Sequence, residues 1–444
     1  MLVGVAILAS FLAGFAAHRI DWLNVIVVSF TYYGVILLAA ALLGRRAKPL
    51  KNDVYRPFVT VMVAARNEEM VIEATVRSLA AMNYKKNGRT WFEVLVLDDR
   101  STDGTWAILQ RLTREISHVR AIHRDPAMKE TGKSAVLNHG LRESEGEILA
   151  VFDADSVVDP NFLKKAIPYL YDERVGGVQG RVRIYNAQKN FLTALQEDEF
   201  AVIAHLTQMG KDFTAGFTAL GGNGQLTRRS VLERTKGWNV FSTTEDLDLS
   251  LQMLLHGSIV RYCPEAVVWQ EGVETWYALQ RQRARWAEGF LKCLFDYTPR
   301  LLFARAGFFA KLDAVLSLLR ILIPLWLWVF YLVAMVYRSF GIFYAPDLSA
   351  PMYVTSSWAF FIVMMFGMLL EGSSGWLLGL LRVARYWIYS FMWVWVVPIG
   401  FYNTLKNLNG ITWDKTFHGG RRDPLNPVIS PAPAVSLTPA LKEG

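Results

Sequence analysis

The chain is poor in the residues that cross-link small proteins or bind structural metals. Its 444 residues include 2 cysteines and 7 histidines. Cys263 and Cys293 form no CxxC pair, and the histidines show no HxxxH-type spacing. The sequence therefore argues against a disulfide-stapled fold and against a structural zinc site.

Charged residues are also scarce. They make up 19% of the chain, against 52% hydrophobic residues, and the mean hydropathy is positive, at +0.22. Few wholly soluble proteins of this size show that balance, which predicts an integral membrane protein. The length allows two or three domains, so a soluble domain and a membrane region fit together in one chain.

The charges that are present have a basic surplus of 47 − 39 = 8. Four basic residues lie within 45–51, directly after an apolar segment, and three arginines lie within 281–285, before a long one. Basic residues beside apolar spans are typical of cytoplasmic flanks and lipid headgroup contacts. We therefore expect a lipid bilayer as a partner, and no nucleic acid.

Apolar runs at the amino-terminal end predict a transmembrane hairpin over residues 1–45. Residues 23–43 carry no charge and are long enough for a bilayer-spanning helix, and residues 1–17 are apolar as well. A cleaved signal peptide is the weaker interpretation, because no basic residue precedes the first run. With the basic cluster on the cytoplasmic side, the next segment begins in the cytosol.

The carboxyl-terminal part predicts a second membrane region over 311–405, with spans near 312–337, 353–370 and 376–402. Before it, residues 276–305 are amphipathic and basic, which is typical of helices that lie in the membrane interface. The Pro-rich segment 423–444 is predicted to be disordered. Three full carboxyl-terminal spans would place the basic residues just before this tail on the outer side of the membrane, against the positive-inside rule. Either one span is therefore re-entrant or interfacial, or the tail is external.

Residues 56–275 have the pattern of a soluble α/β domain. Apolar runs predict strands, buried on both faces, and helical patterns fall between them. The predicted strands are 59–65, 92–98, 119–123 and 147–152, and the predicted helices are 68–82, 104–116 and 133–143. This alternation indicates a parallel sheet covered on both sides, with ligands at the carboxyl ends of the strands.

Two of the predicted strands end in carboxylates. Asp98, Asp99 and Asp103 follow one strand, where they could bind a nucleotide or, alternatively, form a turn and a helix N-cap. Asp153 and Asp155 follow another strand of the same sheet. Two carboxylates at i and i+2 can face one diphosphate, with a divalent cation bound through hard oxygen ligands.

Two later motifs each have a functional and a structural interpretation. Glu245 and Asp246 could supply a general base, or Asp246 could belong to a capping pattern with Thr243 at the start of helix 244–256. Both can hold, because a carboxylate near a helix N-terminus stays ionised. Gln282, Arg285 and Trp286 lie along one helical turn. They could bind a diphosphate and a sugar ring, or they could anchor a helix in the membrane interface.

Taken in order, these motifs resemble the processive-type membrane glycosyltransferases of family 2. The motifs are AARNEE (64–69), DDRSTD (98–103), GKSAVLNHG (132–140), DAD (153–155), GNGQLTRR (222–229), TED (244–246) and QRARW (282–286). That family includes cellulose, hyaluronan and poly-N-acetylglucosamine synthases and the β-monoglucosyldiacylglycerol synthases. The resemblance implies a GT-A fold, Rossmann-like and mostly parallel, for a cytosolic catalytic domain inserted between transmembrane helices.

The resemblance also implies a UDP-sugar donor, Mg2+ or Mn2+, and inversion at the anomeric carbon. Carried over by motif, the donor-binding residues are Ala64, Glu68, Asp99, Lys133 and Asp153. Asp155 would bind the metal, Asp246 would be the base with Glu245 beside it, and Gln282, Arg285 and Trp286 would line the acceptor and leaving-group side.

We therefore expect an inverting, metal-dependent glycosyltransferase in a bacterial-type cytoplasmic membrane, with its catalytic domain facing the cytosol. The NEE, GNGQ and RWAEG runs and segment 413–420 are more similar to glucosyl-diacylglycerol synthases than to polymer synthases. The expected reaction moves glucose from UDP-glucose to diacylglycerol. The alternatives are a processive polysaccharide synthase, a transporter with a nucleotide-binding domain, and a nucleotide-sugar binding protein without catalysis.

Overall fold

The α/β part of the chain is described almost completely in a computed structural model. The described residues are 54–325 and 376–406, apart from 126 and 129, with 33–40, 363–368 and isolated positions at 42, 52, 328, 335–336 and 339–341. Most of the predicted spans 1–45 and 353–370, and all of the tail 423–444, lie outside these residues.

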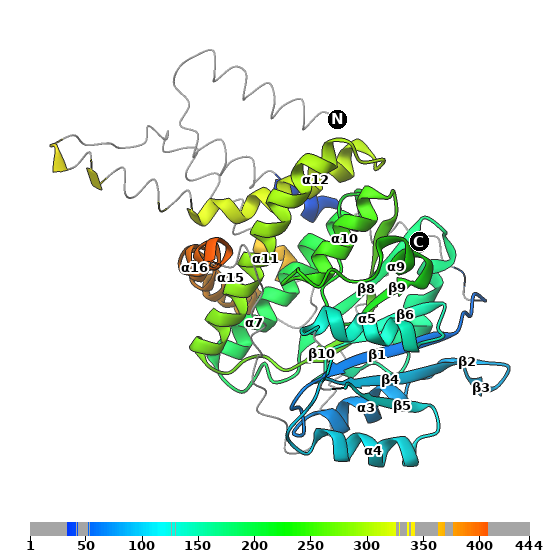
Figure 1. The fold of residues 1–444 in the computed structure, drawn as a ribbon. Helices are drawn as coiled ribbons and strands as arrows, with labels where there is room; N and C mark the ends of the chain where they lie inside the picture. The colour runs from blue at the N-terminus through cyan, green and yellow to red at the C-terminus, as the bar shows by residue number, and fades with distance from the viewer. Residues whose placement is uncertain are drawn as a thin grey trace, which may run out of the picture.

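A mostly parallel sheet of eight strands forms the centre of the fold (Figure 1), in the order β5-β4-β1-β6-β9-β8-β10-β7. The strands are β1 (Val59–Ala65), β4 (Phe92–Asp98), β5 (Val119–His123), β6 (Ile148–Phe152), β7 (Val157–Val158), β8 (Val175–Ile184), β9 (Gln225–Arg228) and β10 (Ile259–Gln270). Strands β5, β4, β1 and β6 are parallel, as are β8 and β10. Strand β9 runs antiparallel to both of its neighbours, and β7 runs antiparallel to β10.

The first half of this sheet follows the sequence pattern closely. Strands β1, β4 and β5 have the predicted bounds, and α3 (Ile72–Ala80), α4 (Thr105–Glu115) and α5 (Lys133–Glu143) fall where helical patterns were expected. Strand β5 differs in its burial, because it is the edge strand of the sheet and leaves Arg120 and His123 exposed. The prediction that this run is buried on both faces is therefore wrong.

Helices cover both faces of the sheet, as predicted. One face packs against α3, α4, α6 (Phe162–Ala166) and the 3-10 helix η1 (Ile167–Tyr171). The other packs against α5, α9 (Arg229–Thr235) and α10 (Glu245–Leu255), which lie above the sheet in Figure 1. A two-stranded hairpin, β2 (Lys85–Lys86) and β3 (Arg89–Thr90), extends beyond the sheet.

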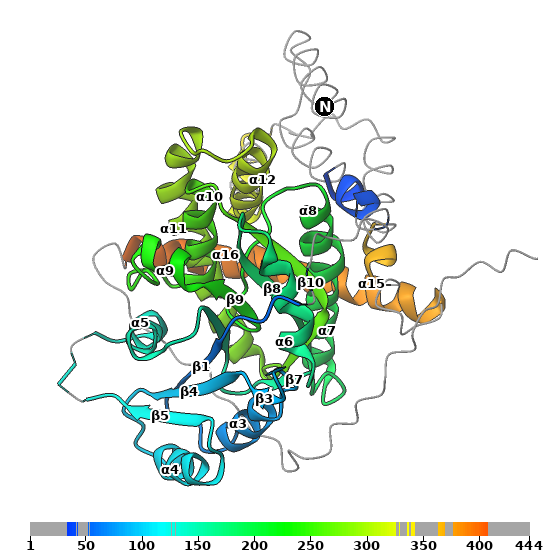
Figure 2. The same ribbon diagram turned by 90° about the vertical axis from the view of Figure 1, so that its right-hand side faces the viewer.

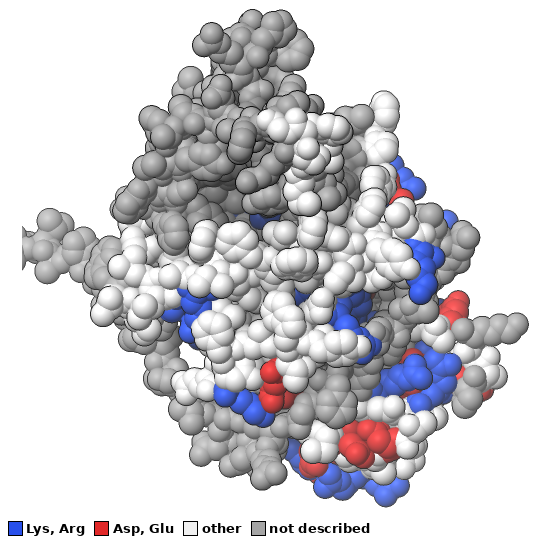
Figure 3. Space-filling model, turned by 90° about the vertical axis from the view of Figure 1, so that its left-hand side faces the viewer, with Lys and Arg blue, Asp and Glu red and all other residues white. Residues whose placement is uncertain are grey.

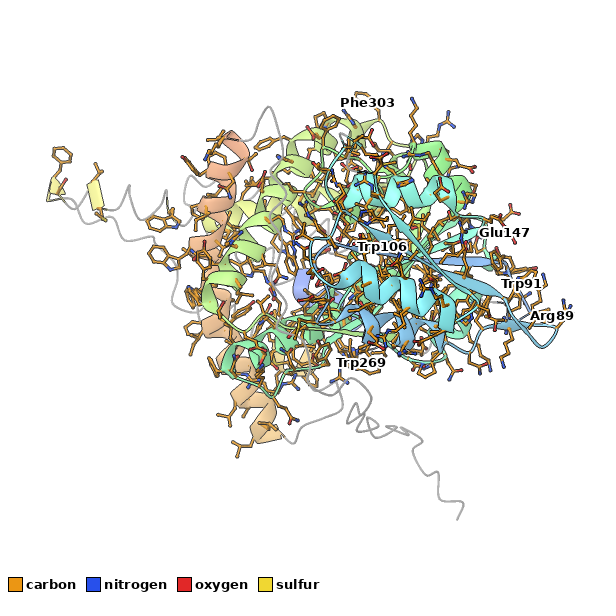
Figure 4. All side chains as sticks on the ribbon, turned by 60° about the horizontal axis from the view of Figure 1, so that its bottom comes forward. Arg89, Trp91, Trp106, Glu147, Trp269 and Phe303 are labelled. Atoms are coloured by element: carbon orange, nitrogen blue, oxygen red, sulfur yellow. The ribbon has the colours of Figure 1, made fainter. Side chains whose placement is uncertain are left out.

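A second group of helices packs beside the sheet. It comprises α7 (Phe191–Val202), a π-helical turn η2 (Ile203–Gln208), α8 (Met209–Phe213), α11 (Trp276–Leu302), α12 (Phe308–Leu319), the 3-10 turn η3 (Arg320–Leu322), α15 (Trp376–Ser390) and α16 (Met392–Lys406). Helix α16 lies along α11, and α15 lies against α7. The amphipathic segment predicted at 276–305 is the long helix α11, which ends at Phe303, 89% exposed at the outer edge of the molecule (Figure 4).

The segment 376–402, predicted as one span, lies in two helices in the structure. Helices α15 and α16 are 15 residues each and follow one another along one line in Figure 2. Arg382 and Arg385 of α15 form ion pairs with the buried Asp198 of α7. Helix α16 packs closely against α11, because a Cβ added at Gly400 would lie only 2.7 Å from Cβ of Ala287. Among the described residues, no helix combines the length and apolarity needed to cross a bilayer.

Helices α15 and α16 instead present an exposed apolar surface, here called the α15–α16 face. Its members are Leu377, Leu378, Leu380, Leu381, Trp387, Ile388, Phe391, Trp395, Tyr402 and Leu405. Uncharged side chains cover much of the described surface on this side, with several groups of Lys and Arg side chains among them (Figure 3). On its inner side α15 packs through Val383 against Leu37 and Leu38, which belong to the predicted span 23–43. An exposed apolar surface of this extent marks an interaction site.

Candidate active site

Register places the carboxylate motifs at one edge of the sheet. Ala65 of β1 pairs with Asp98 of β4, and Val63 of β1 pairs with Phe152 of β6. Asp153, which follows Phe152, therefore lies at the same edge as Asp98. This is the carboxyl end of three parallel strands, where ligands bind in open α/β sheets.

Asp99 is a buried carboxylate with one oxygen fully engaged and one open. Its Oδ1 accepts hydrogen bonds from Arg124 at 2.7 Å and from Arg100 at 2.9 Å. Its Oδ2 is buried and accepts no hydrogen bond, and Arg66 Nη1 lies 4.0 Å from it. Because a buried acceptor without a donor is costly, this atom suits a donor group on a ligand.

The neighbouring aspartates have structural partners within their turn, as the turn interpretation predicts, but neither is a helix N-cap, because the N-cap of α4 is Gly104 and no side chain makes a cap hydrogen bond there. Asp98 accepts from Ser101 Oγ, and its Oδ2 lies 2.5 Å from His123 Nδ1. Asp103 accepts from the backbone N–H of Thr105 at 3.0 Å, in the first turn of α4. Only Asp99 of the three offers an open buried oxygen.

Ala64 and Glu68 lie beside this motif. Ala64 is partly exposed on β1, and Glu68 is buried in the turn before α3. The backbone N–H of Glu68 donates to Thr105 Oγ1 at 2.8 Å. The turn that carries AARNEE is thereby tied to the turn that carries DDRSTD.

Lys133 is the centre of a cluster of carboxylates. Its Nζ lies 2.6 Å from Asp153 Oδ1 and 3.4 Å from Glu245 Oε1. Burial alone would lower the pKa of Lys133, but the charges of Asp153 and Glu245 raise it above the usual lysine value. The ammonium is therefore permanently charged and joins α5, β6 and α10 at the sheet edge.

Asp246 occupies the first turn of α10, next to this cluster. Its Oδ1 accepts from the backbone N–H of Leu247 at 2.8 Å. Burial raises the pKa of Asp246 to about 7, and the charge of Glu245 adds to that rise. The expectation that the helix N-terminus keeps this carboxyl fully ionised is therefore wrong, because burial and Glu245 outweigh it. A pKa near neutrality suits a general base.

The capping interpretation of the same motif fails. Helix α10 begins at Glu245, its N-cap is Thr244, and no side chain makes a cap hydrogen bond. Thr243 is not the cap residue that the pattern predicted. Asp246 therefore serves no capping function that would explain its place in the cluster.

Two residues of the GNGQ motif complete this side of the site, and sequence reasoning gave neither a role. Gly222 has φ +78°, and a Cβ there would lie 3.2 Å from Asp246 Oδ2 and 3.6 Å from Lys133 Nζ. Asn223 Oδ1 accepts from the backbone N–H of Asp153 at 3.3 Å. Two consecutive glycines in GGNG were the available signal, since such runs mark close backbone approach.

Asp155 is buried at the end of β6, and its Oδ2 accepts from the backbone N–H of Glu271 at 2.9 Å. Glu271 follows β10 and was not foreseen from the sequence. Within the described part of the chain, no three His, Cys, Asp or Glu side chains are grouped to hold a metal ion. Mg2+ usually takes only one or two carboxylates and fills its other positions with substrate phosphates and water. The oxygen donors here fit that arrangement.

Helix α11 brings the QRARW motif toward α10. A Cβ at Gly289 would overlap the side chain of Thr244, so the two helices touch at this point. Gln282, Arg285 and Trp286 share the helical face of Gly289, at spacings of seven, four and three residues. Arg285 is partly exposed, and no carboxylate of the described residues lies within ion-pair distance of it. These three residues therefore lie on the side of α11 that meets the start of α10.

Arg283 is an exception to the expectation that basic residues of this segment contact lipid headgroups. It is 1% exposed and pairs with Glu199 of α7, because α7 covers this part of α11. Phe290 packs against an inner apolar cluster. Tyr277 and Phe295 of the same helix are exposed.

Comparisons with known proteins agree with this arrangement. A family described as "Glycosyltransferase like family 2" matches residues 56–289. A β-monoglucosyldiacylglycerol synthase of Synechocystis sp. is 34% identical over 370 residues, which cover 82% of this chain and 75% of the relative. One of Trichormus variabilis is 36% identical over 66% of this chain and 62% of the relative. The chain thus spans less than two thirds of that second relative.

More distant similarities extend to other acceptors. A poly-β-1,6-N-acetyl-D-glucosamine synthase of Staphylococcus aureus is 26% identical and matches 52% of this chain and 54% of its own length. The mannosyltransferase PcManGT of Pyrobaculum calidifontis, solved with GDP-Man and Mn2+, has a similar fold, with a TM-score of 0.58 and 19% identity over 86% of this chain and 99% of that one. With the GT-A-like sheet and its carboxylate edge, these matches show that the chain belongs to the family 2 glycosyltransferases and is an enzyme of that class.

Proposed function

We propose that this glycosyltransferase moves glucose from UDP-glucose to diacylglycerol and forms a β-linked glycolipid. The observation that supports this chemistry is the cluster at the sheet edge. There the carboxyl of Asp246, whose pKa is raised to about 7, lies beside the positively charged Lys133. This arrangement pairs a base for the incoming hydroxyl with a cation for the departing diphosphate.

The donor would lie across the carboxyl edge of β4, β1 and β6. The open Oδ2 of Asp99 would accept a hydrogen bond from the nucleoside, beside Ala64 and Glu68. Lys133 and Asp153 would hold the diphosphate end, 2.6 Å apart at the end of β6. Mg2+ or Mn2+ on Asp155 would supply a positive charge against the developing negative charge of the diphosphate.

The chemical step would be a single displacement. Asp246 takes the proton of the acceptor hydroxyl as that oxygen attacks the anomeric carbon from the face opposite UDP. Lys133 and Arg285 stabilise the charge of the leaving UDP. One displacement inverts the configuration, so an α-linked donor gives a β-linked product.

A membrane acceptor is supported by the surroundings of the site. The α15–α16 face is apolar and exposed, and α16 lies along α11, which carries the QRARW motif. We infer that this face rests on the lipid bilayer at its cytosolic side, with both helices in the interface plane. A lipid hydroxyl could then reach Asp246 from the side of Trp286. The names of the two cyanobacterial relatives favour diacylglycerol.

A polysaccharide acceptor is the second candidate, favoured by the similarity to the staphylococcal synthase. Product analysis separates the two. Membranes with and without diacylglycerol are incubated with labelled UDP-glucose, UDP-GlcNAc or UDP-glucuronate. The proposal predicts a chloroform-soluble product with one sugar, formed faster as diacylglycerol increases. An aqueous product that lengthens with time would overturn it, and absence of UDP release would favour a transporter or a non-catalytic binding protein.

A further inference from the structure

One arginine of the QRARW motif is buried away from the carboxylate cluster and joins three helices. Arg283 of α11 donates through Nε and Nη2 to Glu199 Oε2, at 3.1 and 2.5 Å. The same Glu199 oxygen, in α7, accepts from the hydroxyl of Tyr389 in α15 at 2.9 Å. Arg283 is 1% exposed and Glu199 is 3% exposed, so water screens this pair little.

The guanidinium of Arg283 also supports two residues of the proposed acceptor side. Its Cζ lies 4.0 Å from the ring centre of Trp286, and its Nη1 donates to Oε1 of Gln282. A planar guanidinium can stack on an indole and donate in several fixed directions at once, which an ammonium cannot do. The orientation of both side chains therefore depends on one buried group.

We propose that Arg283 is a positioning residue for the acceptor side of glycosyl transfer. It holds the Trp286 indole and the Gln282 amide toward the site, and Glu199 and Tyr389 fix it in turn. Because this helix face is assigned to the acceptor in the proposed function, the inference rests on that proposal. It adds a residue that touches neither substrate nor metal and acts through Trp286 and Gln282.

The first test compares Arg283→Lys with a matched control. The variant keeps a charge beside Glu199 but loses the stacked plane, so the KM for the acceptor should rise by at least about fivefold while the affinity for UDP stays within about twofold. Arg183→Lys is the control, because Arg183 binds Glu197 of the same α7 through Nε and Nη2 at 2.9 and 2.7 Å. Equal effects of the two variants, or loss of UDP affinity, would indicate a merely structural role.

A double-mutant cycle tests whether Arg283 acts through Trp286. In a Trp286→Ala background, Arg283→Lys should cause little further loss of transfer, because the stacked partner is already gone. If the two substitutions instead reduce transfer independently, so that their fold losses multiply, the proposal is wrong.

If Arg283→Lys does not fold, as thermal unfolding would reveal, Tyr389→Phe replaces it in both tests. That variant removes one hydroxyl from Glu199 and should shift the acceptor KM in the same direction by a smaller factor.

A third measurement needs no activity. In protein labelled with 5-fluorotryptophan, the 19F resonance of position 286, assigned from Trp286→Phe, should move in Arg283→Lys and stay in place in Arg183→Lys. An unmoved resonance in Arg283→Lys would overturn the positioning role even in a protein that transfers no sugar. Absence of transfer to any acceptor by the unaltered protein, with the resonance shift present, would instead reject the proposed function.

Discussion

Individual side chains at the sheet edge divide into those that the structure holds fixed and those that it leaves open. Asp98 and Asp103 are bound within their turn, whereas Asp99 keeps a buried oxygen without a donor. The motifs showed which carboxylates cluster, but a sequence cannot show which oxygen stays open. Arg283 and Glu271 were assigned no role in the site for the same reason, since their roles depend on contacts with α7 and with Asp155.

Asp246→Asn should retain UDP-sugar binding while product formation falls by at least about a hundredfold, the usual scale for a general base. The change is nearly isosteric and Asp246 caps no helix, so helix fraying would not account for the loss. Isothermal titration with UDP and a product assay measure the two effects. Near-normal turnover would remove Asp246 from the mechanism.

The rate of transfer should depend on pH through Asp246. Only the deprotonated carboxylate can accept the proton, and its pKa is raised to about 7 by burial and by Glu245. Turnover at saturating substrates should therefore fall about tenfold for each pH unit below 7 and level off above about pH 8. A rate that is constant between pH 5.5 and 8 would contradict this assignment.

Removal of divalent cations should abolish transfer. Asp155→Ala and treatment with EDTA are expected to have the same effect, because Asp155 is the proposed protein ligand. Oxygen ligation favours Mg2+ or Mn2+ over zinc, so these ions should restore the EDTA-treated enzyme. Full activity in chelator would exclude a metal-dependent reaction.

Elements of the first half of the sheet could be predicted to within a few residues, because each strand there is one continuous apolar run. Strands β8 and β10 have no such run: β8 contains three glycines, and β10 is interrupted by register shifts within Cys263–Val267. Helix α7 buries Gln196, Asp198 and Glu199 together with its apolar residues, so its sequence shows no separate apolar face. Its place beside α11 and α15 follows only from tertiary packing.

Gly222, in the turn before β9, and Gly257, in the turn between α10 and β10, offer a matched pair of substitutions. Gly222 and Gly257 have φ +78° and +77°, but a Cβ at Gly257 would meet nothing within 4 Å. Gly222→Ala and Gly257→Ala should each cost about 1–2 kcal/mol of stability through backbone strain. Only Gly222→Ala should also lower turnover, by at least about tenfold, because its Cβ crowds Asp246 and Lys133. Equal turnover in the two variants would contradict this geometry.

The whole molecule carries its exposed apolar helices α15 and α16 at one end. The α15–α16 face lies opposite the β2–β3 hairpin, which is labelled through Arg89 and Trp91 in Figure 4. Hydropathy predicted spans but could not show that α15 is held to α7 by the Asp198 ion pairs. Those contacts join α15 to the catalytic unit.

Contact between the α15–α16 face and a bilayer can be measured by fluorescence. In vesicles with brominated acyl chains, tryptophan emission should be quenched, and Trp395→Phe should remove part of the quenched fraction, since Trp395 is 61% exposed on this face. Trp91→Phe is the control, because Trp91 lies at the far end of the molecule (Figure 4). Identical quenching in both variants would show that this face does not contact the bilayer.

In the proposed membrane orientation, the alignment of α15 and α16 along one side also determines which concentration of acceptor sets the rate. A catalyst held flat against a surface meets its lipid acceptor in two dimensions, so the mole fraction of acceptor in that surface sets the rate of encounter, and the bulk amount does not. Inert lipid or detergent added at constant total acceptor would then act as a diluent. The enzyme would thereby respond to membrane composition itself and slow as its own substrate is converted.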